Sequence, residues 1–158
     1  MHWNLSTDPL GWAVGPNVRL DHRLSGNWTL GPAYFYFNRM LKTVQTSDSS
    51  YGLYVSYSFS QAMTHSWFLD VAAFYGRVYA EAPDSTGQAE AVHIPNYTER
   101  VMLGHQWYWG HFSLDVSVGE EFNSAGHSPI RDQSGNTFIT VPIYPMTTLV
   151  DTSIGLVF

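Results

Sequence analysis

Hydrophobic and polar positions alternate with a period of two along the last twelve residues of the chain, 147–158. One series is mainly apolar and ends in an aromatic ring: Val150, Thr152, Ile154, Leu156 and Phe158. The other series is small and carries a carboxylate: Asp151, Ser153, Gly155 and Val157. Because successive side chains of a β-strand point to opposite faces, this segment predicts a strand with apolar surroundings on one face and a small polar space on the other.

The same alternation recurs along the chain and predicts eight strands. We expect them at residues 3–8, 12–24, 27–38, 51–60, 67–81, 97–109, 111–122 and 146–158. The connections at 39–50, 82–96 and 123–145 are long, whereas those at 25–26, 61–66 and 109–111 are short. Outer-membrane barrels have short periplasmic turns and long external loops, and this set of strands places every long connection on one side. The predicted fold is therefore all-β, an eight-stranded antiparallel transmembrane β-barrel with up-and-down meander topology.

A second set of strands takes residues 138–144 as a strand of their own and begins the barrel at Trp12. The long connections would then lie on the same side as the chain ends, against the usual arrangement. Pro142 and Pro145 also favour the first set, because proline suits edges and loops better than the middle of a closed sheet. Residues 138–144 can still extend the barrel above the membrane.

Strand parity places many aromatic residues on the outward face, in two groups. The group near the short turns comprises Trp28, Trp67, Trp107, Trp109, Phe112 and Phe158. The group near the long connections comprises Tyr34, Tyr36, Tyr51, Tyr75 and Tyr79. Two aromatic belts with an aliphatic band between them are typical of lipid-facing barrels. The alternative, a water-soluble barrel or sandwich, would leave outside a set of residues with too few charges and too many glycines for a good surface.

The same parity places a set of charged residues inside the barrel: Arg19, Asp21, Arg23, Asp70, Arg100, Asp115, Glu121 and Asp151. An eight-stranded barrel is only wide enough for side chains to fill, and buried charges are costly unless they are paired and hydrogen-bonded. We therefore predict one network of arginines and carboxylates that plugs the lumen. The alternative interpretation of these residues is a proton or ion path, or a gate.

Composition narrows the class of protein further. The chain has 158 residues, enough for one domain, so we assign residues 1–158 to a single barrel. Aromatic residues make up 16% of it, while Lys and Arg together number seven, and no run approaches the ~20 apolar residues of a spanning helix. The absence of cysteine excludes disulfides and thiolate metal sites, and the net charge of −6 argues against nucleic acid. The start at Met1 lacks a signal peptide, so we expect a mature form with an added Met.

The chain resembles the small eight-stranded outer-membrane proteins of the OmpA membrane-domain, OmpX and OmpW type. The resemblance covers the whole chain and rests on the terminal strand ending at Phe158, the aromatic belts and strand–turn–strand runs such as residues 18–31. It implies a bacterial outer-membrane location, a closed or very narrow lumen, contact with membrane lipid or lipopolysaccharide, and a monomer. It also implies that the barrel-assembly machinery inserts the chain through its C-terminal strand. The roles of that family vary, and no functional residue carries over.

Some eight-stranded barrels are enzymes that modify lipid A, which makes catalysis an alternative. On one strand, His111, Ser113 and Asp115 share a face, as a base, a nucleophile and an acid would. That face is inward and His111 lies at a periplasmic turn, away from lipid A in the outer leaflet. A second group, in an external loop, comprises His127, Ser128 and Asp132. Residues of this kind in a loop are usually solvated polar groups, so we predict a non-catalytic protein.

The remaining candidate features are the histidines and the external loops. The seven histidines are scattered without metal-ligand spacing, so we expect no metal and no cofactor. Loops on a rigid scaffold are where recognition usually resides, and residues 123–145 combine Arg131 with the apolar Ile130 and Val141. These loops predict either a simple solvated cap or a partner-binding surface, and the sequence identifies no ligand. The function that we predict is structural, or surface display and adhesion, with a narrow or gated pore as the alternative.

Overall fold

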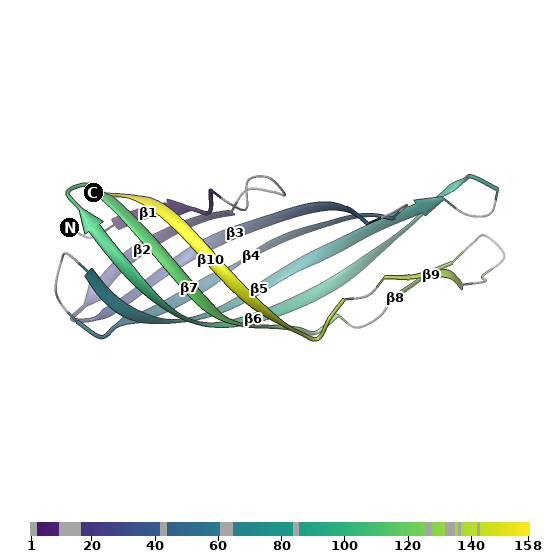
Figure 1. The fold of residues 1–158 in the computed structure, drawn as a ribbon. Helices are drawn as coiled ribbons and strands as arrows, with labels where there is room; N and C mark the ends of the chain where they lie inside the picture. Colours follow the sequence, from purple (N-terminus) through teal and green to yellow (C-terminus); the bar gives the residue numbers. More distant parts are fainter. Residues whose placement is uncertain are drawn as a thin grey trace.

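The computed structural model contains a closed antiparallel barrel of eight strands (Figure 1). It describes residues 3–9, 17–41, 44–60, 65–83, 86–125, 128–131, 135, 137–141 and 143–158. The barrel strands are β1 (Trp3–Thr7), β2 (Asn17–Ser25), β3 (Trp28–Leu41), β4 (Val44–Ser58), β5 (His65–Pro83), β6 (Ala89–Trp109), β7 (Phe112–Asn123) and β10 (Met146–Val157). A separate two-stranded sheet comprises β8 (Ser128–Arg131) and β9 (Thr137–Val141). The prediction of an eight-stranded meander is confirmed, including its first and last strands.

The first and last strands close the barrel. β1 pairs with β10 from Asn4↔Val157 to Thr7↔Ile154, and the backbone groups of Trp3 and Phe158 exchange hydrogen bonds of 3.1 and 3.0 Å. The alternation that predicted the last strand is present, because Val157 is buried while Phe158 is 61% exposed. The C-terminal segment is therefore part of the barrel wall.

Two tight turns mark one end of the barrel, which we call the turn end. Gly26 joins β2 to β3 and Gly110 joins β6 to β7, with φ angles of +56° and +60°. Glycine adopts this left-handed conformation without the steric cost that a Cβ atom imposes. The opposite end is the projecting end, because β3 to β6 extend beyond their neighbours there (Figure 1).

The extension of β3 to β6 differs from the predicted loops. Residues 39–50 form a hairpin that stays paired up to Leu41↔Val44, and residues 82–96 stay paired up to Pro83↔Ala89. The described pairing between β2 and β3 runs from Asn17↔Phe35 to Ser25↔Trp28, and residues 12–16 of the predicted strand 12–24 lie outside the described residues. The polar composition of residues 39–50 and 82–96 favoured loops, but a strand that has left an apolar environment no longer needs an apolar outward series.

The predicted loop 123–145 also contains regular structure. β8 pairs with β9 in a sheet of their own, so the expectation that residues 138–144 extend the barrel is wrong. Ile130 and Val141, which are 1% and 4% exposed, pack on Ala80 and Ala82 of β5. The partner-binding surface predicted from Ile130 and Val141 is therefore wrong for these two side chains, because the protein buries them against its own sheet. Among the described residues, no helix is long and apolar enough to cross a membrane.

Candidate functional site

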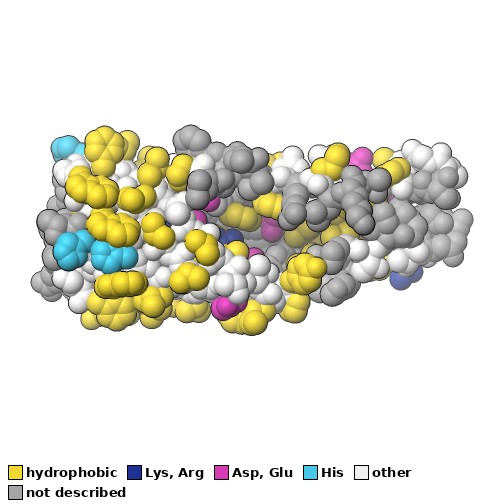
Figure 2. All heavy atoms as spheres, viewed as in Figure 1, with side chains coloured by type: hydrophobic (Ala, Val, Ile, Leu, Met, Phe, Trp, Pro, Cys, Tyr) yellow, Lys and Arg dark blue, Asp and Glu magenta, His cyan; other side chains and the backbone are white. Residues whose placement is uncertain are grey.

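The outer wall of the barrel is covered mainly by apolar side chains (Figure 2). Tyr34, Tyr51, Tyr75 and Tyr97 are register partners on four neighbouring strands, and Tyr51 and Tyr97 are 63% and 61% exposed. Three of these tyrosines were expected on the outward face, whereas Tyr97 was missed. Tyr97 is an odd-numbered residue of the predicted strand 97–109, like the outward Val101 and Leu103, and this alternation would have placed it on the outward face. Tyr36 and Tyr79 also point outward, two and four residues further toward the projecting end than Tyr34 and Tyr75.

Aromatic rings also surround the turn end. The exposed rings are Trp28, Trp67, Trp109, Phe112 and Phe158, and Trp107 is half-buried. His105 makes ring contacts with Trp67 at 5.1 Å and with Trp107 at 4.4 Å, and His65 stacks on it at 5.8 Å. Histidines lie among hydrophobic side chains at this end in Figure 2. Aliphatic side chains such as Leu53, Val71 and Leu103 cover the wall between the two aromatic levels.

Inside the barrel, Arg19 lies at the centre of an ionic cluster that we call the lower cluster. Its Nε atom lies 2.6 Å from Asp21 Oδ1 and its Nη1 atom lies 2.5 Å from Asp70 Oδ2. Asp21 and Asp70 are 6% and 3% exposed. The guanidinium also lies over the ring of Tyr54, 4.3 Å from its centroid. Arg19 therefore forms ion pairs with two buried carboxylates, which leaves the cluster one formal negative charge, and packs on an aromatic face.

A second ionic contact, the upper cluster, lies nearer the projecting end. Arg100 lies 2.6 Å from Glu121 Oε2, and its guanidinium lies 4.8 Å from the ring centroid of Phe35 and 4.9 Å from that of Phe74. Arg100 on β6 and Glu121 on β7 are register partners, so the two charged residues lie directly opposite each other. The cation is thus held between a carboxylate and two aromatic faces.

Two aromatic side chains lie between the ion pairs of the two clusters, and Tyr54 interacts with both Arg19 and Arg100. Tyr54 contacts Phe74 edge to face, with ring centroids 5.4 Å apart, and both side chains are buried. Tyr54 and Phe74 were missed as lumen residues. Tyr54 and Phe74 each follow an inward residue, Gly52 or Ala72, by two positions, and this alternation would have placed them in the lumen. Aromatic residues were expected only on the outward face.

The other predicted lumen charges lie outside these clusters. Arg23 donates hydrogen bonds of 3.2 and 3.0 Å to the carbonyl oxygen of Gly26 in the turn. Asp115 accepts a hydrogen bond of 3.0 Å from Ser153. Asp151 is half-buried and makes no ion pair among the described residues. All three residues were expected in the lumen. They were also expected to form ion pairs with one another or with the other lumen charges, and no such ion pair occurs among the described residues.

The lumen holds two cavities on either side of Arg19. The larger, about 200 Å³, opens toward the turn end and is lined by Arg23, Asp115 and Tyr108, among others. The smaller, about 40 Å³, is lined by Arg100 and Asp151, among others. Arg19 borders both cavities, and its ion pairs therefore form part of the partition between them.

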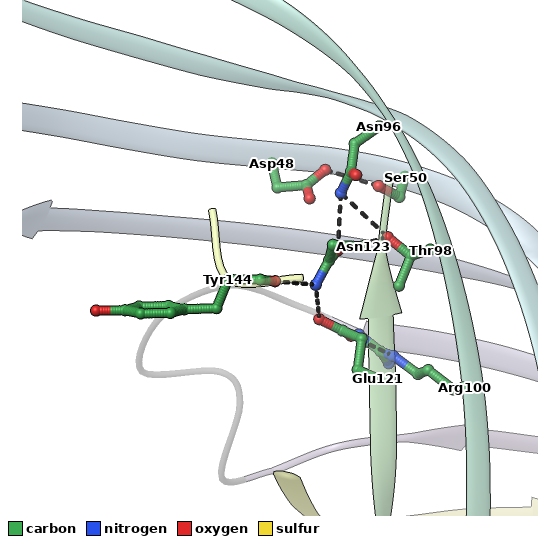
Figure 3. A network of polar contacts seen from close by, with 8 residues as sticks. All are labelled: Asp48, Ser50, Asn96, Thr98, Arg100, Glu121, Asn123 and Tyr144. Carbon is green, nitrogen blue, oxygen red and sulfur yellow. Dashed lines mark hydrogen bonds and ion pairs between the residues drawn. The ribbon is translucent and has the colours of Figure 1, made fainter. Parts of the chain in front are cut away.

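A polar network at the projecting end holds the external segment that follows β7 (Figure 3). The Nδ2 atom of Asn123 donates to Glu121 Oε1 at 3.1 Å and to the carbonyl oxygen of Tyr144 at 3.3 Å. Asn96, which is 1% exposed, donates to Asn123 Oδ1 at 3.0 Å and accepts from the backbone N–H of Ala125 at 3.1 Å. We call this network the external latch, because it connects both ends of the segment to the barrel wall.

Asp48 lies beside the external latch, three residues beyond Tyr51 in the direction of the projecting end (Figure 3). Burial raises the pKa of the Asp48 carboxyl above its ordinary value, and a 2.6 Å hydrogen bond from Ser50 lowers the pKa in part. The negative charge of Glu121 adds to the rise. The carboxyl of Asp48 therefore takes up a proton more readily than that of an exposed aspartate.

Removing the Asn96 amide is expected to release the external segment. In Asn96→Leu, the Ala125 N–H loses its acceptor in a buried place, which costs roughly 2 kcal/mol locally, and Asn123 Oδ1 keeps only the hydrogen bond from the Thr98 hydroxyl. We expect faster hydrogen exchange at Ala125 and Ile130, with the barrel strands unchanged. Asn38→Leu, at an exposed position of β3, is the control and leaves exchange unaltered. Unchanged protection of the segment in Asn96→Leu would show that the latch does not hold it.

The first catalytic candidate is not assembled in the structure. The hydroxyl of Ser113 donates to Asn4 Oδ1 at 3.3 Å, while the Nδ1 atom of His111 lies 3.1 Å from the carbonyl oxygen of Val157. Asp115 interacts with Ser153. The second candidate falls largely outside the described residues, which exclude His127, Asp132 and the side chain of Ser128. In the described part of the chain, no three His, Asp or Glu side chains form a group that could hold a metal ion.

The fold is similar to those of known bacterial proteins. The crystal structure of Neisserial surface protein A (NspA) matches with a TM-score of 0.61 and 12% identity, covering 99% of this chain and 92% of that chain. The structure of Ail, the attachment invasion locus protein of Yersinia pestis, gives a TM-score of 0.49 and 14% identity, covering 98% and 93%. No family model and no curated protein sequence matches the chain. The chain thus has the fold of the small eight-stranded outer-membrane barrels.

Proposed function

We propose that this chain is a monomeric, integral protein of the bacterial outer membrane that displays its projecting end at the cell surface for adhesion. The apolar outer wall supports the location, because exposed apolar residues in a continuous band are stable in contact with lipid. Membrane lipid or lipopolysaccharide would surround this band. The terminal strand that ends at Phe158 would be the segment that the barrel-assembly machinery engages. The Neisserial protein with the same fold is itself named as a surface protein.

In this proposal the lumen is a structural plug and not a catalytic site. The lower cluster and the upper cluster balance most of the lumen charge, and Tyr54 and Phe74 fill the space between them. A filled lumen gives a rigid cylinder, which is a suitable base for a displayed surface.

The observation that carries the adhesive role is the length of the projecting sheet. β3 and β4 stay paired up to Leu41↔Val44, and β5 and β6 stay paired up to Pro83↔Ala89. A paired sheet that continues beyond the apolar wall is a rigid platform whose exposed side chains can contact a partner. Asn38 and Met40 of β3 lie on its exposed outward face. The proposed partner is therefore a protein on another cell surface that contacts this face.

Charges placed on the outward face of the projecting sheet are expected to abolish adhesion. A charge that is buried in an interface without a partner is costly, so expressing bacteria that carry Asn38→Lys and Met40→Lys should lose most of their binding to cultured epithelial cells. The matched control carries Thr137→Lys and Thr140→Lys, which add equal charge at exposed positions of β9 in the separate two-stranded sheet.

The comparison of the two double variants separates contact through the outward face of β3 from a general effect of charge. We expect the control to adhere like the parent, with heat-modifiable gel mobility showing that both variants fold. Equal losses in the two variants would assign the effect to surface charge. Full adhesion of the β3 variant would reject this face as the contact surface.

A narrow pore is the second candidate function, and the pair of cavities favours it. A channel would need the two cavities to join past Arg19, which borders both. Steady, discrete openings of the unmodified protein in planar bilayers would favour a pore over a sealed barrel.

A further inference from the structure

The larger of the two cavities is a recess whose lining reaches the turn end. Its lining includes Gly110 in the turn between β6 and β7 and Ser60, which follows β4. Its inner wall includes the ion pair of Arg19 with Asp21. A volume of about 200 Å³ is below the usual range for drug-sized ligands and suits a molecule the size of a small amino acid.

Two opposite charges face this recess without a charged partner. Arg23 donates only to the carbonyl oxygen of Gly26 and forms no ion pair within the described residues. Asp115 accepts from Ser153 through Oδ2, whereas its Oδ1 atom is buried and has no hydrogen-bond partner. A buried carboxylate oxygen without a partner is costly, and a ligand that donates a hydrogen bond to it removes that cost.

The rest of the lining offers both polar and apolar contacts. Hydroxyl groups come from Thr29, Ser56, Ser58 and Ser66, and the ring of Phe68 supplies an apolar contact. Hydroxyl groups both donate and accept hydrogen bonds, so they can hold either end of a polar ligand. Arg19 is already paired with Asp21 and Asp70, so Arg23 and Asp115 are the charged groups of the lining that are left for the ligand.

We propose that the recess binds a small zwitterion, with its anionic group on Arg23 and its ammonium group on Asp115. A guanidinium presents paired N–H donors to a carboxylate or phosphate, and the free oxygen of Asp115 accepts from an ammonium group. A ligand with one charge would leave the other protein charge without a partner. The proposed topology places the mouth of the recess in the periplasm. The proposal otherwise requires only the turn end of the barrel and is independent of adhesion at the projecting end.

The same chemistry occurs in a free amino acid and in the headgroup of an ethanolamine phospholipid. Two experimental arms distinguish these sources. In the first, the refolded full chain in detergent micelles is titrated with L-alanine and, separately, with O-phosphoethanolamine. In the second, the chain is placed in nanodiscs of phosphatidylglycerol with or without phosphatidylethanolamine. Backbone amide shifts of Ser66, Gln106 and Gly110 report on the recess in both arms.

We expect saturable shifts of these amides with the zwitterions, and affinities weakened about tenfold or more in Asp115→Asn and in Arg23→Gln. L-Alanine amide, which lacks the anion, and N-acetyl-L-alanine, which lacks the ammonium group, should bind at least as weakly. Glu99→Gln, which removes a charge on the exposed face of β6, is the control and should keep the parental affinity. Shifts that depend on phosphatidylethanolamine alone would identify a lipid headgroup as the source.

Two results would overturn the proposal. The first is the absence of saturable shifts with every zwitterion in both arms, while Asp115→Asn and Arg23→Gln fold normally by heat-modifiable mobility. The second is binding that the two variants leave unchanged, which would place the ligand elsewhere. Failure of the adhesion experiment would not affect either result, because the projecting end of β3 and the turn between β6 and β7 that borders the recess lie at opposite ends of the barrel (Figure 1).

Discussion

Replacing Arg19 by methionine is expected to lower the free energy of unfolding by about 3–5 kcal/mol, because it leaves two buried carboxylates without their cation. Asp21 and Asp70 are 6% and 3% exposed, and Arg19 supplies the ion pair of each. The contact of the guanidinium with the Tyr54 ring is lost as well. Urea titration of the protein in detergent, followed by tryptophan fluorescence and by heat-modifiable mobility, measures the change.

A triple variant provides the matched control for Arg19→Met. Changing Asp21 and Asp70 to asparagine in the same chain removes the uncompensated charge, and a neutral replacement of a buried ion pair is often close to neutral in stability. We therefore expect the triple variant to recover most of the lost stability. If Arg19→Met unfolds like the parent, the two carboxylates are solvated and the lower cluster is not a plug. If the triple variant is no more stable than the single one, the loss comes from packing on Tyr54 and not from charge.

The barrel was predictable from the sequence because one physical rule acts along its whole length. In a membrane barrel, each strand between the aromatic belts has lipid on one face and a narrow lumen on the other, so the hydrophobic pattern has a period of two. The terminal strand from Met146 to Val157 shows this pattern most clearly, and its prediction also fixed the number of strands. The same rule does not act above the belts of such a barrel, where neither face of a strand meets lipid. The sheet therefore continues there without the signal that identified it below.

The site was less predictable, because parity gives the direction of a side chain but not its partner. Arg19, Arg100 and the five predicted carboxylates that face inward were all expected in the lumen. Their division into two clusters depends on Tyr54 and Phe74, whose rings lie between the two arginines. Pairing also depends on register between distant strands, as in the contact of Arg19 on β2 with Asp70 on β5. A single sequence contains no direct record of that register.

The external segment shows a second limit of sequence patterns. Apolar side chains in a polar loop fit either a partner surface or a local core, and Ile130 and Val141 have the second role. Ala80 and Ala82 of β5 supply the facing surface. Ala80 already lay within the predicted strand 67–81, but a strand pattern does not say which segment covers it. Small residues at these positions leave room for the larger side chains of the segment.

Gly119→Ala is expected to impair folding of the barrel on the order of 3 kcal/mol, because its new Cβ atom has no space. A Cβ at this position of β7 would overlap with the carbonyl oxygen of Val101 and with the Cα of Met102 on β6. These are backbone atoms, so the β6–β7 ladder must shift to admit the methyl group. Ser117→Ala, two residues away on the same strand and face, already has its Cβ accommodated and is the matched control. We expect the glycine variant to refold poorly in detergent and to unfold at lower urea, while the serine variant behaves like the parent. Parental stability of Gly119→Ala would show that the two strands can separate locally at little cost, and close backbone approach would then not explain the glycine.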